Sequence, residues 1–348
     1  MHRQLIVAFL FLLIACQKDT PSTCESNLLL REVAPFSVGT TSDDVYKNWQ
    51  QVVSGMHFNR ITSENMLKMD RMMIRPDSNN YYPISWITRD AMNAGFTEFH
   101  AHPVVWHKQV PSWLPDVPPN DLKEIMLRYC SGYKSQLSLF NQFVQITGID
   151  VVNEALNEDG SFRRSFWYEA MGRDYIRLAF QEFSDMNPET KLFYNDYNLA
   201  LNPKKLDAAL DLCDWLRSTG VRIDGIGMQM HIDIHEPSQM DIAAAFEKIS
   251  SRGYMVHVSE LDVSINPRNT ETTATPTLLS KQADVYAGIF RLYNQLPKKH
   301  QYGITVWGYS DSESWIPGEY NRFDAPLLID AFGNKKPAYC ACLNALKK

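Results

Sequence analysis

The chain has 348 residues, a formal net charge of −6 and no dense block of lysine and arginine. This charge pattern argues against nucleic-acid binding. The length suits one large α/β barrel or two small domains. The 8 Trp and 16 Tyr side chains can stack on sugar rings as well as pack a core.

The N-terminus predicts a targeting segment. Arg3 precedes an apolar run over residues 5–15 that is too short to span a bilayer and suits a signal peptide. The run ends on Leu-Ile-Ala-Cys, which resembles the cleavage box of a bacterial lipoprotein. We therefore expect removal of residues 1–15, a lipid on Cys16 and a tether over residues 16–27. An ordinary signal peptide with a coincidental cysteine is the alternative.

This segment also predicts where the protein resides. We expect an outer-membrane lipoprotein that faces the periplasm or the cell surface, with the lipid as its only contact with the membrane. Gln17-Lys18-Asp19 resembles the surface-export signals of some Bacteroidetes lipoproteins.

From residue 28 onward, β-branched runs alternate with amphipathic helical patterns, without a linker or a repeat. Strands are predicted at residues 36–40, 57–62, 98–106, 149–154, 191–196, 224–231, 255–262 and 303–310. Helices between them include residues 121–145, 173–185, 203–218, 240–251 and 281–296. This alternation predicts a single-domain α/β fold, a (β/α)8 TIM barrel over residues 28–348. A doubly wound open sheet is the alternative, but no glycine-rich phosphate loop opens a helix.

Polar residues gather at the carboxyl ends of the predicted strands, where a (β/α)8 barrel has its active site. They occupy residues 62–65, 102–107, 153–154, 195–198, 229–231, 260–262 and 307–311. Glu154 is predicted to close the fourth strand and Glu260 the seventh. One such glutamate alone could be a solvated loop carboxylate. Two that face each other across the barrel mouth are what cleavage of a glycosidic bond requires.

The neighbours of the two glutamates strengthen this interpretation. Asn153 could bind a sugar 2-hydroxyl, an interaction that strengthens in the transition state. His231 could hydrogen-bond Glu260, and Asp262, two residues along the same strand face, could orient that histidine. Such a network would keep Glu260 ionised.

An ordered set of motifs extends from about Leu28 to the C-terminus. It comprises residues 58–68, 102–113, 150–155, 195–198 (Asn-Asp-Tyr-Asn), 229–231, 259–262 (Ser-Glu-Leu-Asp), 307–315, 326–330 and 336–339. This set resembles family 10 of the glycoside hydrolases, a group dominated by endo-β-1,4-xylanases. The resemblance implies internal cleavage of xylan with retention of configuration, no cofactor, no metal and a monomeric catalytic domain.

The resemblance also implies a role for each matching residue. Glu154 matches the acid/base and Glu260 the nucleophile, which His231 and Asp262 would position. The implied sugar contacts are Glu64, Asn65, Lys68 and Gln109 on the non-reducing side, His102, Trp106, Asn153 and Gln229 around the cleaved sugar, Tyr197 and Asn198 on the leaving side, and Trp307 and Trp315 as aromatic walls. His107 is predicted to be structural, on the strand face opposite Trp106.

Four positions depart from the family pattern. Met69 and Ile149 stand where tryptophan is usual, and Ala101 and Met230 stand where glycine is frequent. The carboxylates and most sugar ligands are kept, so these departures concern the pocket wall and the preferred substrate.

Two other functions fit parts of the sequence. His100 and His102, with His231 and His235, resemble the metal ligands of amidohydrolase barrels, but that arrangement needs the pair on the first strand and here it is on the third. A glycan-binding lipoprotein that has lost its activity is the other alternative, and the intact Glu154 and Glu260 argue against it.

The cysteines separate into two groups. Cys130 and Cys213 fall in apolar helical patterns and are predicted to be buried thiols. Cys24, Cys340 and Cys342 lie near the chain ends, where one disulfide is possible. The spacing of Cys340 and Cys342 is too tight for an ordinary bridge between them and does not suit a metal site.

Overall fold

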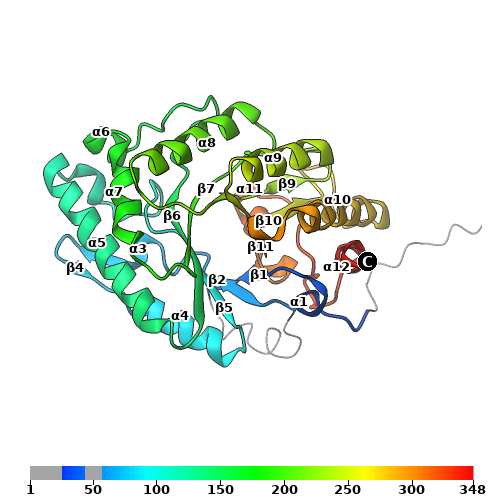
Figure 1. Ribbon diagram of the computed structural model, residues 1–348. Coiled ribbons are helices and arrows are strands. Elements are labelled where there is room, and N and C mark those ends of the chain that lie inside the picture. The colour runs from blue at the N-terminus through cyan, green and yellow to red at the C-terminus, as the bar shows by residue number, and fades with distance from the viewer. Residues whose placement is uncertain (1–25, 44–56, 348) are drawn as a thin grey trace, which may run out of the picture.

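The computed structural model describes residues 26–43 and 57–347, in which helices surround a central ring of strands (Figure 1). The predicted signal peptide, Cys16 and Cys24 lie outside these residues. Near the two ends of the described chain, the Leu30 amide donates to the Tyr339 hydroxyl over 3.0 Å. This bond joins α1 (Leu30–Val33) to α12 (Pro337–Leu346).

Eight strands form the ring, and each runs parallel to both of its neighbours. In chain order they are β1 (Val38–Thr41), β2 (Arg60–Thr62), β5 (Glu98–Ala101), β6 (Gln145–Asn153), β7 (Lys191–Asp196), β8 (Gly225–Met228), β10 (Met255–Ser264) and β11 (Gln301–Val306). β11 pairs with both β1 and β10, which closes the barrel. The closed ring confirms the predicted (β/α)8 barrel and rules out an open sheet.

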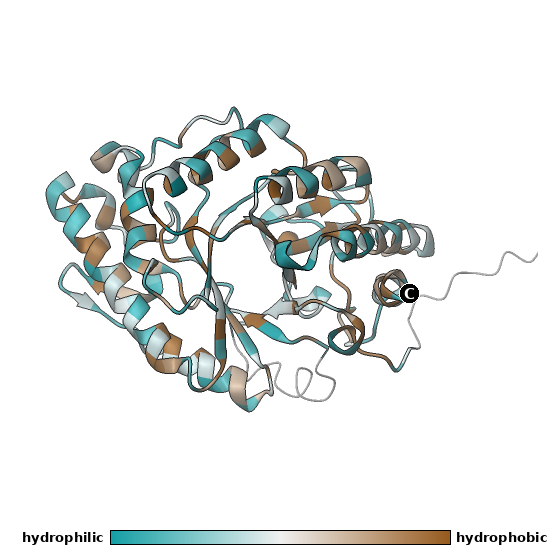
Figure 2. Ribbon diagram, in the orientation of Figure 1, coloured by the Kyte–Doolittle hydropathy of each residue, from teal (hydrophilic) through white to brown (hydrophobic). Residues whose placement is uncertain are grey.

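Helices cover the outside of this ring. They are α3 (Met69–Met72), α4 (Tyr82–Asn93), α5 (Pro119–Phe140), α6 (Phe166–Met171), α7 (Asp174–Phe183), α8 (Pro203–Ser218), α9 (Gln239–Ser251), α10 (Pro276–Gln295) and α11 (Trp315–Tyr320), besides α1 and α12. Hydrophobic and hydrophilic residues alternate along most of them (Figure 2), as expected for helices with one face on the sheet. A small hairpin, β3 (Met73–Arg75) with β4 (Ser78–Asn79), was not predicted.

Local capping explains where several helices begin. The Asn202 side chain accepts from the Lys205 amide, and Pro203 then opens α8. Ser238 and Asp241 form a capping box at the start of α9. The Thr275 side chain accepts from the Leu278 amide, and Pro276 then opens α10. These are sequence-encoded start signals, so the start of α8 lies where the sequence predicts it.

Several predicted boundaries are wrong, and three of them bear on the site. The helix predicted to reach residue 145 ends at Phe140, because the Asn141 side chain accepts from the Ile146 amide over 2.7 Å and turns the chain into β6. The third strand ends at Ala101 rather than at residue 106. The sixth ends at Met228, and His231 begins a separate strand, β9 (His231–Asp233), beside β10.

The last two errors have local causes. Pro103 has no amide hydrogen with which to continue a ladder. Trp106 and His107 therefore lie in the loop after β5. The prediction that they lie on opposite faces of a strand is wrong. Met230 adopts φ +60°, in the left-handed region, which interrupts the sixth strand.

The cysteines behave largely as predicted. Cys130, Cys213 and Cys342 are buried free thiols. Cys340 is disulfide-bonded, so it does not bridge to its neighbour Cys342. Within the described residues, no helix is both long enough and apolar enough to cross a membrane.

Candidate active site

A cleft of about 660 Å³ lies at the carboxyl ends of the barrel strands. Most of the predicted site residues line it: Glu64, Asn65, Lys68, His102, Gln109, Glu154, Tyr197, Asn198, Gln229, His231, Glu260, Trp307 and Trp315. Trp106, Asn153 and Asp262 are behind this lining. Lys108, Glu319 and Tyr320 also line the cleft and were not predicted.

Glu260 lies on β10 and is almost fully buried. Its Oε1 accepts from Asn195 Nδ2 over 2.7 Å, and its Oε2 is 3.2 Å from His231 Nε2. Burial by itself would raise the pKa of Glu260, but the nearby His102 and His231 lower it below the ordinary value. Glu260 is therefore held as a carboxylate.

His231 is held between two carboxylates, as its sequence position predicts. Its Nδ1 lies 2.8 Å from Asp262 Oδ2, and its Nε2 faces Glu260. Burial opposes a charge on this ring, but Asp262 and Glu260 outweigh burial and raise its pKa to about 10. His231 is thus an imidazolium at neutral pH, and both of its N–H groups donate. Trp315 Nε1 also donates to Asp262 Oδ2 over 2.9 Å, which gives this carboxylate oxygen a second donor.

Glu154 is held in a different way. It directly follows β6 and has φ +55°, an uncommon conformation for a residue with a side chain. Its amide donates to the Asn195 carbonyl over 2.9 Å, and its own carbonyl accepts from Arg163 Nε over 3.0 Å. The next amide, of Ala155, donates to the Tyr194 hydroxyl over 3.1 Å. Three bonds to the backbone thus stabilise a strained turn that points the carboxyl group into the cleft.

A chain of neutral amides connects the two glutamates. Gln229 Nε2 donates to Glu154 Oε1 over 3.1 Å and to Asn153 Oδ1 over 3.3 Å. Asn195 Nδ2 donates to the same Asn153 oxygen over 3.0 Å and also to Glu260. The amides of β6, β7 and β8 therefore fix the positions of both carboxyl groups.

Sequence reasoning missed the role of Asn195, although this residue belongs to a quoted motif. The Ser259 hydroxyl donates to Asn195 Oδ1 over 2.6 Å, which orients the amide so that its Nδ2 faces Glu260. A signal was present: Asn195 lies next to the end of a strand that is between the strand of Glu154 and the strand of Glu260.

Below the leaving side of the cleft is a charged frame. Lys205 is fully buried, 2.9 Å from Asp196 Oδ1, 3.1 Å from Glu158 Oε1, and 3.4 Å above the centre of the Tyr197 ring. Arg163 Nη2 donates to the Tyr197 hydroxyl over 3.0 Å. Burial raises the pKa of Asp196 to about 6, although the nearby positive charge of Lys205 lowers it.

This frame supports Glu154 indirectly. Asp196 accepts a hydrogen bond from the Tyr194 hydroxyl, which in turn accepts from the Ala155 amide. Arg163 bonds both Tyr197 and the Glu154 carbonyl. Arg163 and Lys205 were not predicted as functional, because nothing in their local sequence indicates which side chains they reach.

The other end of the cleft carries the predicted polar contacts for non-reducing-side sugars. Lys68 Nζ donates to Gln109 Oε1 over 2.5 Å and to Asn65 Oδ1 over 3.0 Å. Asp43, which was not predicted, accepts from Asn65 Nδ2 over 2.8 Å. Burial, with a further contribution from Asp43, raises the pKa of Glu64 to about 7.

Trp106 does not line the cleft but supports it from behind. Its ring lies 5.0 Å from Lys68 Nζ, and its carbonyl accepts from Trp167 Nε1 over 2.8 Å. His107 beside it is half-buried, and burial lowers its pKa to about 3, with Arg163 adding to the effect. His107 is therefore neutral, and it is absent from the cleft lining.

His102 lies at the base of the cleft. Its Nδ1 is 2.9 Å from Asp150 Oδ2, and its ring meets Trp307 edge-on with centroids 5.2 Å apart. His100 shares the same Asp150 oxygen at 3.1 Å. Burial opposes ionisation of Asp150, but the two histidines lower its pKa to about 2.

The alternative metal site is not assembled as predicted. Among the described residues, one set has metal-ligand spacing: His100, Asp150 and His257, with ligand atoms within 4.8 Å of one another. It excludes His102, His231 and His235, and it lies inside the barrel below the cleft. The buried Arg60 guanidinium is 3.5 Å from His257 Nε2, so a fixed positive charge already occupies the position next to this set.

The same cleft-bearing fold and a related sequence occur in known proteins. The model of "Glycosyl hydrolase family 10" matches residues 29–345. Endo-1,4-beta-xylanase A of Fusarium oxysporum f. sp. lycopersici is 34% identical over 298 residues, which cover 83% of this chain and 87% of the relative. Endo-1,4-beta-xylanase of Geobacillus stearothermophilus is 31% identical over 341 residues, 92% of this chain and 99% of the relative. The crystal structure of xylanase 10B from Thermotoga petrophila RKU-1 in complex with xylobiose superposes with a TM-score of 0.84 at 28% identity, over 92% of this chain and 98% of that one.

Proposed function

The chain belongs to glycosyl hydrolase family 10 and is an endo-1,4-β-xylanase, and on that premise we propose that Glu154 and Glu260 cleave the xylan backbone by double displacement. The observation that carries this proposal is the hydrogen-bonded chain across the barrel mouth. It joins an ionised Glu260 to Glu154 through neutral amides alone. Retention of configuration follows from two successive inversions at the same carbon.

The first step forms a bond from Glu260 to the anomeric carbon. As this bond forms, Glu154 donates its proton to the glycosidic oxygen and the leaving sugar departs. In the second step Glu154, now a carboxylate, takes a proton from water, and the oxygen of that water displaces Glu260. His231 and Asn195 keep their bonds to Glu260 and orient it for attack.

The stereochemical course tests this mechanism directly. Xylohexaose cleaved by the native protein is followed by proton NMR before the new reducing end mutarotates. We expect the β-anomer to appear first. If the α-anomer appears first, water attacks the substrate directly and Glu260 is not a nucleophile.

We also propose that the cleft prefers pentose over hexose chains. Trp307 and Trp315 line it beside His231, with their rings 6.2 and 5.0 Å from the imidazole. They would crowd the position of a hexose CH₂OH group. Faster turnover of cellulose or mixed-linkage glucan than of xylan, compared as kcat/KM, would contradict this preference. We also expect a monomeric catalytic domain, as the family resemblance implies, which light scattering can test.

For the N-terminus we propose a lipoprotein signal over residues 1–15, a lipid on Cys16 and a tether to residue 27. The support is the Leu-Ile-Ala-Cys junction after an apolar run. A three-chain anchor would hold firmly, since each buried CH₂ contributes about 0.8 kcal/mol. We expect native protein in the outer-membrane fraction and Cys16→Ala protein in the soluble fraction. Membrane-bound Cys16→Ala protein would contradict the proposal, and protease treatment of whole cells would distinguish surface from periplasmic exposure.

A further inference from the structure

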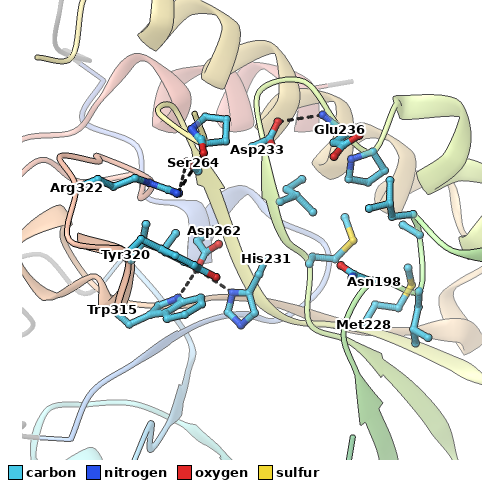
Figure 3. Close-up of a pocket in the computed structure, with 18 residues that line it drawn as sticks. Asn198, Met228, His231, Asp233, Glu236, Asp262, Ser264, Trp315, Tyr320 and Arg322 are labelled. Carbon is cyan, nitrogen blue, oxygen red and sulfur yellow. Dashed lines mark hydrogen bonds and ion pairs between the residues drawn. The ribbon is translucent and has the colours of Figure 1, made fainter. Parts of the chain in front are cut away.

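A second cavity, of about 310 Å³, opens beside the catalytic cleft (Figure 3). It lies between the loop at residues 198–201, strands β8 and β9, and helix α11. The two spaces have Asn198, His231, Trp315 and Tyr320 in common, so they meet on the leaving side of the cleavage point. We call this second cavity the side pocket.

The walls of the side pocket are largely apolar. Leu199, Met228, Met230 and Ile316 contribute side chains that are almost completely buried. At the mouth, Leu201 is 43% exposed and Tyr320 is 53% exposed. Large apolar side chains left exposed around an apolar cavity mark a place where a ligand would bury them.

Two acidic side chains of the side pocket, Asp233 and Glu236, have no cationic partner among the described residues. Asp233 accepts from the amides of His235 and Glu236 over 2.6 and 3.1 Å, and no basic side chain of the described residues pairs with it. Glu236 lines the same side (Figure 3).

The basic groups nearby are already paired. Arg322 lies 3.3 Å from Asp324 and above the Tyr320 ring, and His231 lies between Asp262 and Glu260. The uncompensated charge of the pocket is therefore negative.

These features select among ligands. A further sugar ring needs polar partners all around its hydroxyl groups, and the wall formed by Leu199, Met228, Met230 and Ile316 provides none. A uronic acid or another anionic substituent would be repelled by Asp233 and Glu236. A neutral, flat apolar group would bury Leu201 and Tyr320 and fits the volume.

We propose that the side pocket binds a neutral aromatic group attached to the leaving-side end of the substrate. This proposal rests on the proposed function, because the sugar that carries the group would occupy the catalytic cleft. The pocket would then give the protein a preference for xylan fragments that carry aryl substituents next to the cleavage point.

Binding to an inactive full-length variant tests the proposal without turnover. Methyl, benzyl and 4-carboxybenzyl β-xylotriosides are titrated into Glu260→Ala protein by calorimetry. We expect the benzyl glycoside to bind about tenfold more tightly than the methyl glycoside, since its ring buries additional apolar surface. The carboxybenzyl glycoside should bind no more tightly than the methyl glycoside.

Variants locate the effect. Ala200 lines the side pocket and is almost buried, so Ala200→Phe should fill it and remove the benzyl preference. Ala244→Phe, on the exposed face of α9, is the matched control and should keep it. If Ala200→Phe fails to fold, Leu201→Asn at the exposed mouth should reduce the preference by about threefold. Asp233→Asn combined with Glu236→Gln should strengthen binding of the carboxybenzyl glycoside alone.

Each outcome has a definite meaning. Equal affinity for the methyl and benzyl glycosides, or a benzyl preference that survives in both Ala200→Phe and Leu201→Asn, overturns the side pocket as a binding site. If no xylotrioside binds and the native protein cuts no xylan, the proposed function fails first and the side pocket fails with it. Xylan cleavage without a benzyl preference refutes the side pocket alone.

Discussion

The two halves of the candidate active site hold their carboxyl groups by opposite means. Charged side chains hold Glu260 in place: His231 is cationic, and Asp262 in turn fixes the position of His231. The Glu154 side chain is hydrogen-bonded only by neutral amides. The charged groups Arg163, Asp196 and Lys205 act instead on the Glu154 backbone and on the residues that support it.

This difference matches the two chemical roles. A nucleophile must stay ionised in a buried site, so it needs a cation in direct contact. An acid/base must change its charge twice in each cycle, and a fixed ionic partner would oppose one of those changes. Neutral amides can hydrogen-bond both the protonated and the ionised carboxyl group of Glu154. The contacts to its backbone keep the position of this group constant through the cycle.

Removing each carboxyl group gives the sharpest contrast and the largest effect. Glu260→Ala should lose the first step for every substrate, by on the order of 10⁵-fold in kcat. Glu154→Ala should lose activity on xylan but still react with a xyloside whose phenol leaves unaided. Added azide should then speed this variant and yield a β-glycosyl azide, identified by NMR. An α-azide from the Glu154 variant would show that the two roles are reversed.

Removing the cation beside Glu260 should have the next largest effect. We expect His231→Asn to lower kcat/KM on xylan by about 100-fold and to move the acid limb of the pH profile upward, because Glu260 would lose a group that lowers its pKa. The exposed His235→Asn variant is the control. An unshifted acid limb in His231→Asn would mean that this histidine acts only by packing.

The same histidine should make stability depend on pH. Its folded-state pKa, about 10, exceeds the ordinary value of 6.5, so the folded protein binds this proton more tightly than the unfolded chain. This contribution to stability is complete below about pH 6.5 and is lost as pH rises toward 10. Urea unfolding of native and His231→Asn protein at pH 6 and pH 10 should show the native advantage disappearing at the higher pH.

Weakening the frame around Glu154 should have a smaller effect that depends on the substrate. Arg163→Gln removes the bonds to the Glu154 carbonyl and to Tyr197. We expect kcat on xylan to fall by about 10- to 100-fold, because displacement of an acid by about 1 Å has such an effect. An aryl xyloside with a good leaving group should be much less affected, since it needs no acid.

The neighbouring Arg164 provides a matched control for this prediction. It is exposed and pairs with Glu169, so Arg164→Gln should leave both rates unchanged. Equal losses on xylan and on the aryl xyloside in Arg163→Gln would point to general unfolding rather than to a misplaced acid.

The smallest expected effect concerns Glu64, a carboxyl group for which burial outweighs the nearby Lys68 and the hydrogen bond with Asn65. Its folded-state pKa of about 7 is above the ordinary value, so stability should fall as pH rises from about 4.5 to 7. The Glu64→Gln variant should lack this decline, and at pH 8 its free energy of unfolding should exceed that of the native protein by roughly 1 kcal/mol. Its KM for xylo-oligosaccharides should rise a fewfold. A steeper decline in the variant would contradict this account of Glu64.

The sequence by itself determined the barrel and the edge where the site lies. Alternating strands and helices predict a parallel ring, and strand-end residues such as Glu154, His102 and Gln229 must then converge on one rim. Short-range rules also predicted that His231 and Asp262 would meet, because the spacing of Asp262 from Glu260 sets its strand face. These properties depend only on the period of a strand and on the direction of its neighbours.

Tertiary structure alone decided how the two glutamates are held. Contacts between segments far apart in the chain decide the left-handed backbone at Glu154 and Met230. They also decide which groups Arg163 contacts and which two oxygens accept hydrogen bonds from Asn195. No local sequence pattern encodes such contacts. The sign of φ at a turn and the direction of a long side chain both follow from how the strands and loops of the closed barrel pack together. For the same reason the side pocket, which forms between the loop at residues 198–201, strands β8 and β9 and helix α11, could be found only in the folded protein.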